Sequence, residues 1–168
     1  VDLKRALDLG SYQLEERLGV GGMGEVWRAR HRLLARPAAV KLIRPEVFEA
    51  AGVAKQSALR LRFEREAQTT ALLKSPHTIN LFDYGVTDEG AFYYVMELLD
   101  GFDLKTLVER FGPLSVERTL QVLMQACHSL AEAHATGLVH RDITPANIFL
   151  CRYGRDVDFV KVLDFGLV

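Results

Sequence analysis

The sequence has 168 residues, of which 49% are hydrophobic and 26% are charged, and its formal net charge is -1. This composition is typical of a globular domain and excludes an intrinsically disordered chain. The small net charge predicts no nucleic-acid partner and no attraction to an anionic membrane surface.

Two cysteines, Cys127 and Cys151, are too few for a disulfide framework. We interpret them as buried, unlinked thiols, which fits a reducing compartment and predicts a cytoplasmic location. No apolar stretch reaches the roughly 18 residues that a membrane-spanning helix needs. This segment therefore predicts no membrane contact, while an anchor elsewhere in a longer protein stays open.

The first half of the chain predicts mainly strands. Short runs of β-forming residues cover 12–20, 24–31 and 37–44. A helical period follows over 53–74 and places Leu59, Phe63, Ala67, Thr70 and Lys74 on one stripe. Two more strands, 79–84 and 91–98, flank a turn at Gly90, a position that suits a positive φ.

The second half predicts a long helix and then two short strands. Ser115 is a candidate N-cap and Gly137 a natural stop. The apolar face of this helix is predicted to consist of Leu120, Leu123, Met124, Cys127, Leu130, Ala131 and His134. The strands follow at 148–150 and 159–163. This order predicts a segregated α+β fold of two lobes that join near residues 98–101.

The stretch "GVGGMGEV" places Gly19, Gly21 and Gly24 in G-x-G-x-x-G spacing. Glycines let the backbone approach phosphate oxygens and offer N–H donors. The same pattern also fits a simple tight hairpin. A dinucleotide-binding fold with Glu46 as the ribose acid is a third reading, but Pro37 and the strand after it leave little room for the helix it needs.

Lys41 stands in the middle of the apolar strand "PAAVKLI". It is either a snorkelling lysine at a sheet edge or a lysine aimed at phosphate oxygens and steadied by a buried acid. Glu66 can supply that acid because it lies beside the inward stripe of the following helix, whereas Glu64 lies farther from the stripe.

Two further stretches contain candidate catalytic and metal-binding residues. In "HRDITPANIFL", Asp142 follows a His-Arg pair and precedes Asn147, and in "VLDFGLV", Asp164 precedes Phe165 and a glycine. An aspartate can accept a proton from an attacking hydroxyl group. Amide and carboxylate oxygens are hard ligands that suit Mg²⁺. Each of these residues in isolation is also a common turn or cap residue.

Taken together, the glycine loop, strand lysine, helix glutamate, H-R-D…N and D-F-G stretches resemble the eukaryotic-type (Hanks-type) protein serine/threonine kinase family. The resemblance covers about residues 12–168, and "FEREAQ" and "MELLDG" are most similar to bacterial members. It implies a bilobal kinase-like fold with a complete small β-rich lobe and a partial helical large lobe. The implied domains are an N-terminal extension (1–11), the small lobe (12–98) and the hinge with part of the large lobe (99–168).

The resemblance also implies ATP and Mg²⁺ as cofactors. The implied ATP-binding residues are Gly19, Val20, Gly21, Gly22, Met23, Gly24, Val26, Ala39, Lys41, Met96, Glu97, Leu99, Asp103 and Phe149. In the family, the glycine loop covers the phosphates and the lysine, paired here with Glu66, holds the α- and β-phosphates. Met96, Glu97 and Leu99 would line or bond the adenine.

For the transfer itself, the resemblance implies Asp142 as the catalytic aspartate, with Lys41 acting on the phosphates and with Asn147 and Asp164 as ligands of Mg²⁺. Pro145 follows the serine/threonine pattern, so the expected partners are proteins with Ser or Thr acceptors.

Two features depart from the family pattern. Thr144 stands where serine/threonine kinases usually have a lysine that helps neutralise the transferring phosphoryl group. The sequence also stops two residues after the D-F-G stretch, so we expect this part alone to be inactive or weak. A nucleotide-binding pseudokinase that acts as a scaffold or switch is the alternative function, and an α+β interaction domain without nucleotide is a third.

Overall fold

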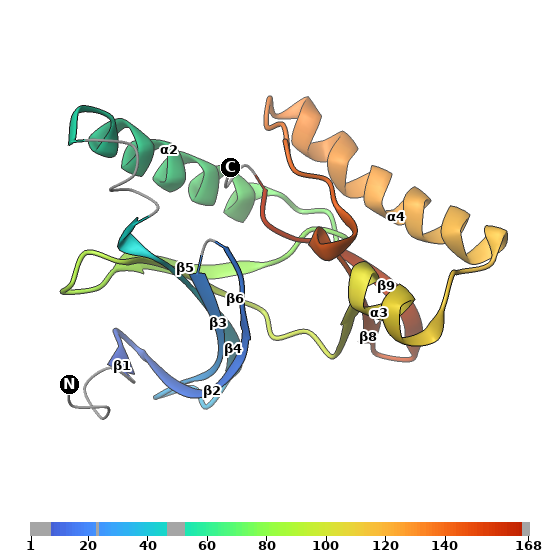
Figure 1. Cartoon of the computed structure of the whole chain (residues 1–168), viewed down its shortest axis with the longest axis horizontal. Helices are drawn as coiled ribbons and strands as arrows, with labels where there is room; N and C mark the ends of the chain where they lie inside the picture. Colours follow the sequence, from blue (N-terminus) through green and yellow to red (C-terminus); the bar gives the residue numbers. More distant parts are fainter. Residues whose placement is uncertain (1–7, 23, 47–52, 166–168) are drawn as a thin grey trace. The chain divides into compact units, whose positions relative to one another are not determined.

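The computed structural model describes residues 8–22, 24–46 and 53–165, and it divides the chain into two compact units (Figure 1). Unit 1 comprises Val1–Glu64 and Leu81–Leu98, and unit 2 comprises Arg65–Asn80 and Leu99–Val168. Helix α2 (Val53–Leu72) therefore contributes its first part to unit 1 and its last part to unit 2. Residues 65–80, which the sequence placed with the small lobe, group with unit 2.

Unit 1 is built on an antiparallel sheet in the order β1-β2-β3-β4-β6-β5. The strands are β1 (Asp8–Leu9), β2 (Tyr12–Val20), β3 (Gly24–His31), β4 (Pro37–Ile43), β5 (Leu81–Val86) and β6 (Phe92–Met96). The predicted strands are confirmed, although β5 begins and ends two residues later than expected. β1 lies within the predicted N-terminal extension. It joins the sheet, since Leu9 pairs with Tyr12 of β2.

The two faces of this sheet carry different residues because side chains alternate along each strand. One face forms a hydrophobic core of Leu9, Tyr12, Leu14, Ala29, Ala38, Val40, Tyr93 and Val95. On the other face, Phe63 of α2 stacks on Tyr94 of β6, with 6.4 Å between the ring centroids, and lies 6.5 Å from the ring of Phe92. The buried position of Phe63 confirms the predicted inward stripe at this turn of α2.

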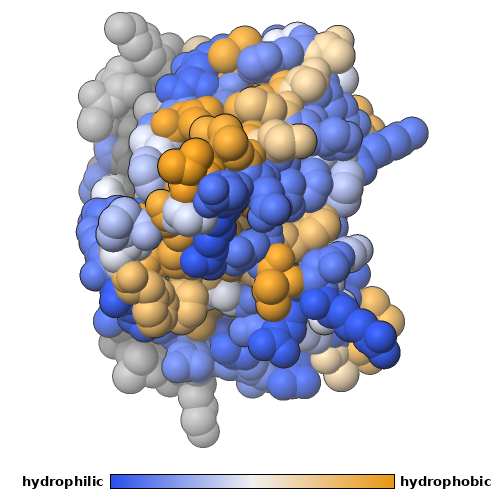
Figure 2. Space-filling model, turned by 90° about the vertical axis from the view of Figure 1, so that its right-hand side faces the viewer, coloured by the Kyte–Doolittle hydropathy of each residue, from blue (hydrophilic) through white to orange (hydrophobic). Residues whose placement is uncertain are grey.

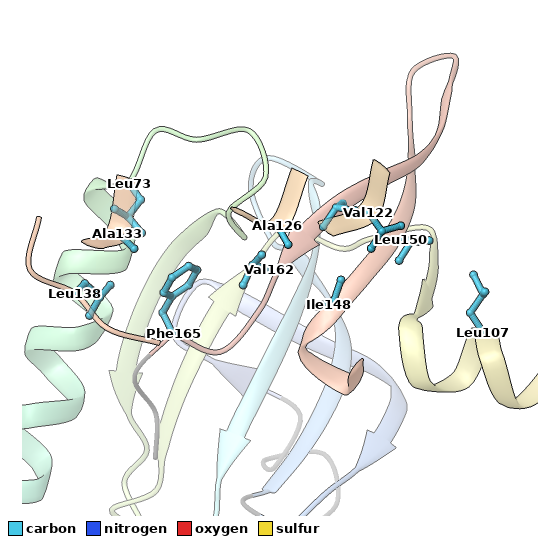
Figure 3. Close-up of a cluster of buried hydrophobic side chains, with 11 residues drawn as sticks. Leu73, Leu107, Val122, Ala126, Ala133, Leu138, Ile148, Leu150, Val162 and Phe165 are labelled. Atoms are coloured by element: carbon cyan, nitrogen blue, oxygen red, sulfur yellow. The ribbon is translucent and has the colours of Figure 1, made fainter. Parts of the chain in front are cut away.

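Unit 2 packs two helices, α3 (Leu104–Phe111) and α4 (Val116–Ala135), with a sheet in the order β7-β8-β9. Its strands are β7 (Gly101–Asp103), β8 (Ile148–Tyr153) and β9 (Asp156–Val162), and the short 3-10 helix η1 (Pro145–Asn147) precedes β8. Its core consists of Leu73, Leu107, Val122, Ala126, Ala133, Leu138, Ile148, Leu150, Val160, Val162 and Phe165 (Figure 3).

The end of α2 joins this core with one difference from the prediction. Ala67 and Thr70 are buried as expected, but Lys74 is exposed and Leu73 is buried in its place. The helix ends at Leu72, so the helical period no longer applies at residue 74. The side chain of Leu59 lies outside the described residues.

Most residues of the predicted apolar face of α4 are not the ones that the helix packs on the core of unit 2. The helix buries Val122, Ala126, Ser129 and Ala133, whereas Leu120, Leu123, Met124 and Cys127 of the predicted face are exposed. Small residues on the buried face let α4 lie close to the sheet, and the larger apolar residues on the opposite face dominated the sequence pattern. Figure 2 shows apolar residues gathered at the surface on the side where α3 and the start of α4 lie.

The predicted N-cap and the predicted glycine stop of α4 are both confirmed. The side chain of Ser115 accepts a hydrogen bond from the N–H of Arg118 at 3.2 Å, and Gly137 has a φ of 80° just beyond the helix. Arg118 also forms a bidentate ion pair with Asp158 of β9, at 2.7 and 2.8 Å, which raises the pKa of the guanidinium above its usual value. Helix α4 is thereby fastened to the start of β9.

Residues 74–79 attach the end of α2 to the rest of unit 2. The carboxylate of Glu132 on α4 accepts hydrogen bonds from the backbone N–H groups of Lys74 and Ser75, at 2.8 and 2.6 Å. The hydroxyl groups of Thr78 and Ser129 are buried and hydrogen-bonded at 2.7 Å. The Thr78–Ser129 bond is buried and the bond of Ser75 is partly buried, so this segment belongs to the packed part of unit 2.

Both cysteines are free thiols, as expected, but only Cys151 is buried. The prediction of burial is wrong for Cys127 because it lies on the exposed face of α4. Within the described residues, no helix is both long enough and apolar enough to span a bilayer.

Candidate active site

The glycine stretch forms the tight connection between β2 and β3. Gly21 and Gly24 exchange backbone hydrogen bonds of 2.8 and 3.3 Å across the turn. A Cβ atom at Gly24 would lie 1.8 Å from the carbonyl oxygen of Leu42 on β4, so packing alone demands glycine there. Met23, also predicted to contact ATP, lies outside the described residues.

Packing within the described chain does not require glycine at the other positions of this stretch. A Cβ atom at Gly19, Gly21 or Gly22 would meet nothing within 4 Å, and none of the three has a positive φ. Their missing side chains therefore leave open space along the loop that the described chain does not fill. Open space beside a glycine loop fits the close approach of phosphate oxygens.

Strand register brings five of the predicted ATP-binding residues to one face of unit 1. Gly19 is paired with Val26 across β2 and β3, and Val26 is paired with Lys41 across β3 and β4. Ala39, two residues before Lys41, is paired with Met96 of β6. Directly paired residues share a face, so all five lie on the face opposite the hydrophobic core of unit 1.

In unit 2, the segment 140–147, named here the catalytic loop, brings Asp142 and Asn147 together. The side-chain amide of Asn147 donates to the backbone oxygen and to Oδ2 of Asp142, at 2.9 Å in each case. The N–H of Leu163 donates to the carbonyl oxygen of Asn147 at 2.9 Å. This hydrogen bond attaches Leu163, the residue directly before Asp164, to Asn147.

His140 fixes the catalytic loop from inside. It is 1% exposed, its Nε2 lies 2.6 Å from the carbonyl oxygen of Leu163, and its Nδ1 accepts from the N–H of Asp142 at 3.3 Å. Nδ1 is an acceptor here, so Nε2 carries the proton and donates to Leu163. The ring also packs on Phe165, at 4.7 Å between centroids. His140 therefore packs and hydrogen-bonds within the loop.

Two residues of this region have backbone conformations that are unusual for a side chain with a Cβ atom. Arg141 has a φ of 70° and Asp164 a φ of 55°. A non-glycine residue in the left-handed region costs on the order of 1–3 kcal/mol, and such residues cluster at functional sites. The catalytic loop and the start of the D-F-G stretch are therefore held in place by their surroundings.

Glu66 is buried, with 8% of its surface exposed, as the helical pattern predicted. Within unit 2, its Oε1 lies 3.1 Å from Nη1 of Arg141. Sequence reasoning missed this ion pair, because it treated Arg141 only as part of a motif. The pairing of Glu66 with Lys41 stays a prediction.

Asp103 and Phe149 face each other across β7 and β8. Asp103 is the N-cap of α3, where its two carboxylate oxygens accept from the N–H and the hydroxyl of Thr106, at 2.9 and 2.6 Å. Sequence reasoning missed both β7 and α3, which give Asp103 this capping role. Its contact with a ribose stays a prediction.

The oxygen atoms of Asn147 and Asp164 are of the kind that fits Mg²⁺. The side-chain nitrogen of Asn147 is engaged by Asp142, which leaves its Oδ1 as an acceptor, and Asp164 adds a carboxylate. Across the described residues, no group of three or more His, Cys, Asp or Glu side chains forms a candidate metal site. This sparse set is typical of Mg²⁺, which usually takes one or two protein ligands and completes its shell with phosphate and water.

Comparison with known sequences decides the family. A family model described as protein kinase domain matches residues 12–168. The chain belongs to this family. Members of the serine/threonine branch generally use ATP and Mg²⁺.

Similar curated proteins are bacterial serine/threonine-protein kinases. PknH of Mycobacterium bovis is 39% identical over 94% of this chain, PknB of Mycobacterium tuberculosis is 40% identical over 93%, and pkn3 of Myxococcus xanthus is 35% identical over 93%. The chain spans only 25%, 24% and 27% of these relatives, respectively. The predicted resemblance to bacterial Hanks-type kinases is confirmed.

Two crystal structures of the PknI kinase domain of Mycobacterium tuberculosis are also similar, one of them a double mutant. They match the whole chain with TM-scores of 0.83 and 0.81 at 29% identity. The chain covers 63% and 64% of those chains. The predicted kinase-like α+β fold is confirmed, and the chain is part of a kinase domain.

Proposed function

We propose that the protein carrying this chain transfers the γ-phosphoryl group of ATP to Ser or Thr hydroxyl groups of proteins. The observation that carries the proposal is the pair of hydrogen bonds from Asn147 to Asp142, next to the strand that leads into Asp164. This arrangement supplies an oriented carboxylate and the amide oxygen of Asn147, and Asp164 follows the residue that is hydrogen-bonded to Asn147. The serine/threonine kinase names of the relatives support the same activity.

The proposed nucleotide contacts follow the family pattern. The open loop of Gly19, Gly21 and Gly22, together with Val20, Met23 and Gly24, would cover the phosphates, while Lys41 would hold the α- and β-phosphates with Glu66 as its partner. The adenine and ribose would contact Val26, Ala39, Met96, Glu97, Leu99, Asp103 and Phe149. The shared face of Gly19, Val26, Ala39, Lys41 and Met96 in unit 1 supports this assignment.

In the transfer step, the carboxylate of Asp142 accepts the proton of the acceptor hydroxyl. The hydroxyl oxygen forms the new bond to the γ-phosphorus, and the bond from that phosphorus to the bridging oxygen breaks, which releases ADP. Asn147 holds Oδ2 of Asp142 in one orientation. Asn147 and Asp164 would hold Mg²⁺, which would supply positive charge to neutralise the phosphate oxygens.

We also propose the domain limits implied by the family: an extension to residue 11, a small lobe over 12–98, and the hinge with part of the large lobe over 99–168. The free thiols of Cys127 and Cys151 support a reducing, cytoplasmic location for this segment.

A nucleotide-binding switch without phosphoryl transfer is the second candidate function. Thr144 favours it, because this residue brings no positive charge to the catalytic loop. Thr144 is half-buried at the N-cap position of η1, where its side chain makes no capping hydrogen bond. Its hydroxyl group has therefore no structural task at the start of η1.

The test is transfer of radiolabelled phosphate from ATP to a generic protein substrate by the native protein that carries this chain. We expect Asp142→Asn to lower the rate by about 10²–10⁴-fold, the usual range for losing a general base. Asp156→Asn, a matched change at an exposed residue of β9, should leave it unaltered. Absence of transfer by the native protein, with Asp142→Asn equally silent, would reject the proposal.

A further inference from the structure

Unit 2 contains a surface pocket that the proposed function does not use. It is lined by residues of α3, the start of α4 and the strands β7, β8 and β9, and we name it the α3–α4 pocket. Its volume of about 510 Å³ lies within the range of about 300–1,000 Å³ that is typical of ligand sites. None of its lining residues belongs to the catalytic loop or to the D-F-G stretch.

Strand pairing separates part of this pocket from the proposed nucleotide contacts. Phe102 of β7 is paired with Leu150 of β8, and the next pair along these strands is Asp103 with Phe149. Successive side chains point to opposite faces of a sheet. The part of the pocket formed by Phe102 and Leu150 therefore lies on the face opposite Asp103 and Phe149, two proposed contacts of ATP.

The surface of the α3–α4 pocket is largely apolar. Leu107 and Leu150 are buried at its base, while Phe111 and Val157 at its sides are 69% and 70% exposed. The ring of Phe111 packs edge-on against that of Phe102, with 5.9 Å between the centroids. Large apolar side chains that are exposed around a concave site mark an interaction surface. Figure 2 shows apolar residues on this side of unit 2.

The charges around the pocket favour an acidic ligand. Arg118 and Asp158, both in its lining, neutralise each other in their bidentate ion pair. Arg152 and Asp100 also line the pocket, and the guanidinium of Arg110 lies 5.2 Å from the centroid of the Phe102 ring. Among the described residues, these last three form no ion pair, which leaves two cations beside the pocket against one acid. Complementary charge on a ligand is therefore negative.

The edge of the sheet favours an extended ligand. Within the described chain, β7 is the end strand of the order β7-β8-β9, and Gly101 and Phe102 are exposed. An exposed edge strand offers backbone groups to an extended peptide, whose alternate side chains can enter a neighbouring pocket.

We propose that the α3–α4 pocket docks an extended peptide segment of a partner protein, with large apolar side chains at alternate positions and an acidic residue beside them. The apolar side chains fill the space between Phe102, Phe111 and Val157, and the acid faces Arg110 and Arg152. This docking goes beyond the proposed kinase function and requires no phosphoryl transfer.

A panel of synthetic decapeptides tests the pocket on the native protein that carries this chain. Each peptide has two large apolar residues (Leu, Ile or Phe) two positions apart and two Glu residues before or after them. The other positions are Gly, Ala and Asn, so that no peptide is a Ser or Thr acceptor. We expect at least one peptide to bind with a Kd below about 300 μM in fluorescence anisotropy, and its Lys-for-Glu counterpart to bind at least about threefold more weakly.

Variants of the pocket locate the binding. Phe111→Ser should weaken binding about 10-fold, because it removes a central apolar wall. Arg152→Glu should reverse the preference for Glu peptides over Lys peptides. Leu34→Ser, at a residue of unit 1 that is 68% exposed, is the matched control for Phe111→Ser and should leave the Kd unaltered. Since Phe111 is so exposed, its replacement should leave the midpoint of denaturant unfolding unchanged.

Hydrogen exchange supplies a second readout. The bound peptide should slow exchange about threefold or more in segments 100–111 and 150–158, and leave the catalytic loop unchanged. Protection of the catalytic loop in place of these segments would overturn the docking proposal.

The remaining outcomes are equally decisive. No saturable binding below about 1 mM by any peptide, or equal weakening in Leu34→Ser and Phe111→Ser, would overturn the docking proposal. A native dimer that dissociates in Phe111→Ser and binds no peptide would assign the surface to a second copy of the chain and also overturn it. A protein that binds the peptide but transfers no phosphate would keep the docking role and reject the kinase function.

Discussion

Asn147 donates its side-chain amide to two oxygens of Asp142, the backbone carbonyl and Oδ2, at 2.9 Å in each case. One residue thus orients the proposed catalytic carboxylate with its nitrogen and keeps its oxygen for a metal ion. The two functions of Asn147 are therefore linked by the geometry of a single amide group.

Replacing Asn147 by aspartate separates these functions. Asn147→Asp keeps an oxygen ligand but removes both hydrogen bonds to Asp142 and sets a second negative charge beside it. By analogy with losing one preorganised donor, we expect kcat to fall about 10²–10³-fold while the requirement for Mg²⁺ persists. Steady-state kinetics over a range of Mg²⁺ concentrations measures both. A kcat within threefold of the native value would contradict this role of Asn147.

The glycines of the β2–β3 connection should respond differently to alanine. Gly24→Ala forces a Cβ atom against the Leu42 carbonyl, so we expect a loss of about 1–3 kcal/mol in the free energy of unfolding. Gly19→Ala places its Cβ atom in open space, so stability should persist while ATP affinity falls about tenfold, or ~1.4 kcal/mol. Denaturant unfolding and calorimetric titration distinguish the two. Unchanged ATP affinity in Gly19→Ala would argue against a phosphate cradle.

Thr144 is the site for a gain of activity. Its side chain caps nothing at η1, so Thr144→Lys should fold normally and add a positive charge near the transferring group. We expect kcat to rise by up to about 10²-fold with little change in the KM for ATP. Initial rates with a saturating protein substrate give the comparison. If Thr144→Lys leaves kcat unaltered in a stable protein, charge at this position does not limit the reaction.

Stability at high pH should depend on Tyr93. Burial, and then the charges of Asp83 and Tyr12, raise the pKa of the Tyr93 phenol above its usual value of 10.0. A raised pKa in the folded state means that the stabilising contribution is complete below about pH 10 and is lost as the pH rises through the raised pKa. Tyr93→Phe should therefore lose less thermal stability than the native protein between about pH 9 and 11. The exposed Tyr153→Phe is the control, and parallel curves for all three proteins would contradict the prediction.

Much of the fold was predictable because its local signals agree with its packing. Strand limits in the first half followed from β-forming runs, and the positions of Ser115, Gly90 and Gly137 marked a cap and two turns that the structure confirms. The strand β7 and helix α3 were missed, because a three-residue strand and a short helix give too little periodicity to detect.

The apolar pattern of α4 did not identify the face that the helix buries in unit 2. Hydrophobicity favoured Leu120 and Met124, which are 56% and 72% exposed, over Ala126 and Ser129, which are 4% and 0% exposed. Which side of a helix is buried depends on how closely the neighbouring elements approach it. When a helix has two apolar faces, the hydrophobic pattern alone does not show which face is buried.

The candidate site was predictable as a set of residues but not as a set of contacts. Asp142, Asn147 and Asp164 stood out by motif, and the register of unit 1 gathers Val26, Lys41 and their neighbours on one face. The ion pair of Arg141 with Glu66 was not predictable, because it joins residues far apart in the sequence and depends on a left-handed turn.

The most direct measurement is the unfolding stability of the native protein with and without ATP and Mg²⁺. At about 100 times the dissociation constant, bound nucleotide should raise the free energy of unfolding by ~2.7 kcal/mol. We expect this gain to shrink strongly in Lys41→Met and in Asp164→Asn, and to persist in Asp156→Asn. No stabilisation of the native protein at millimolar ATP with Mg²⁺, or an equal gain in Lys41→Met, would contradict the assignment of this chain as the ATP-holding part of a kinase.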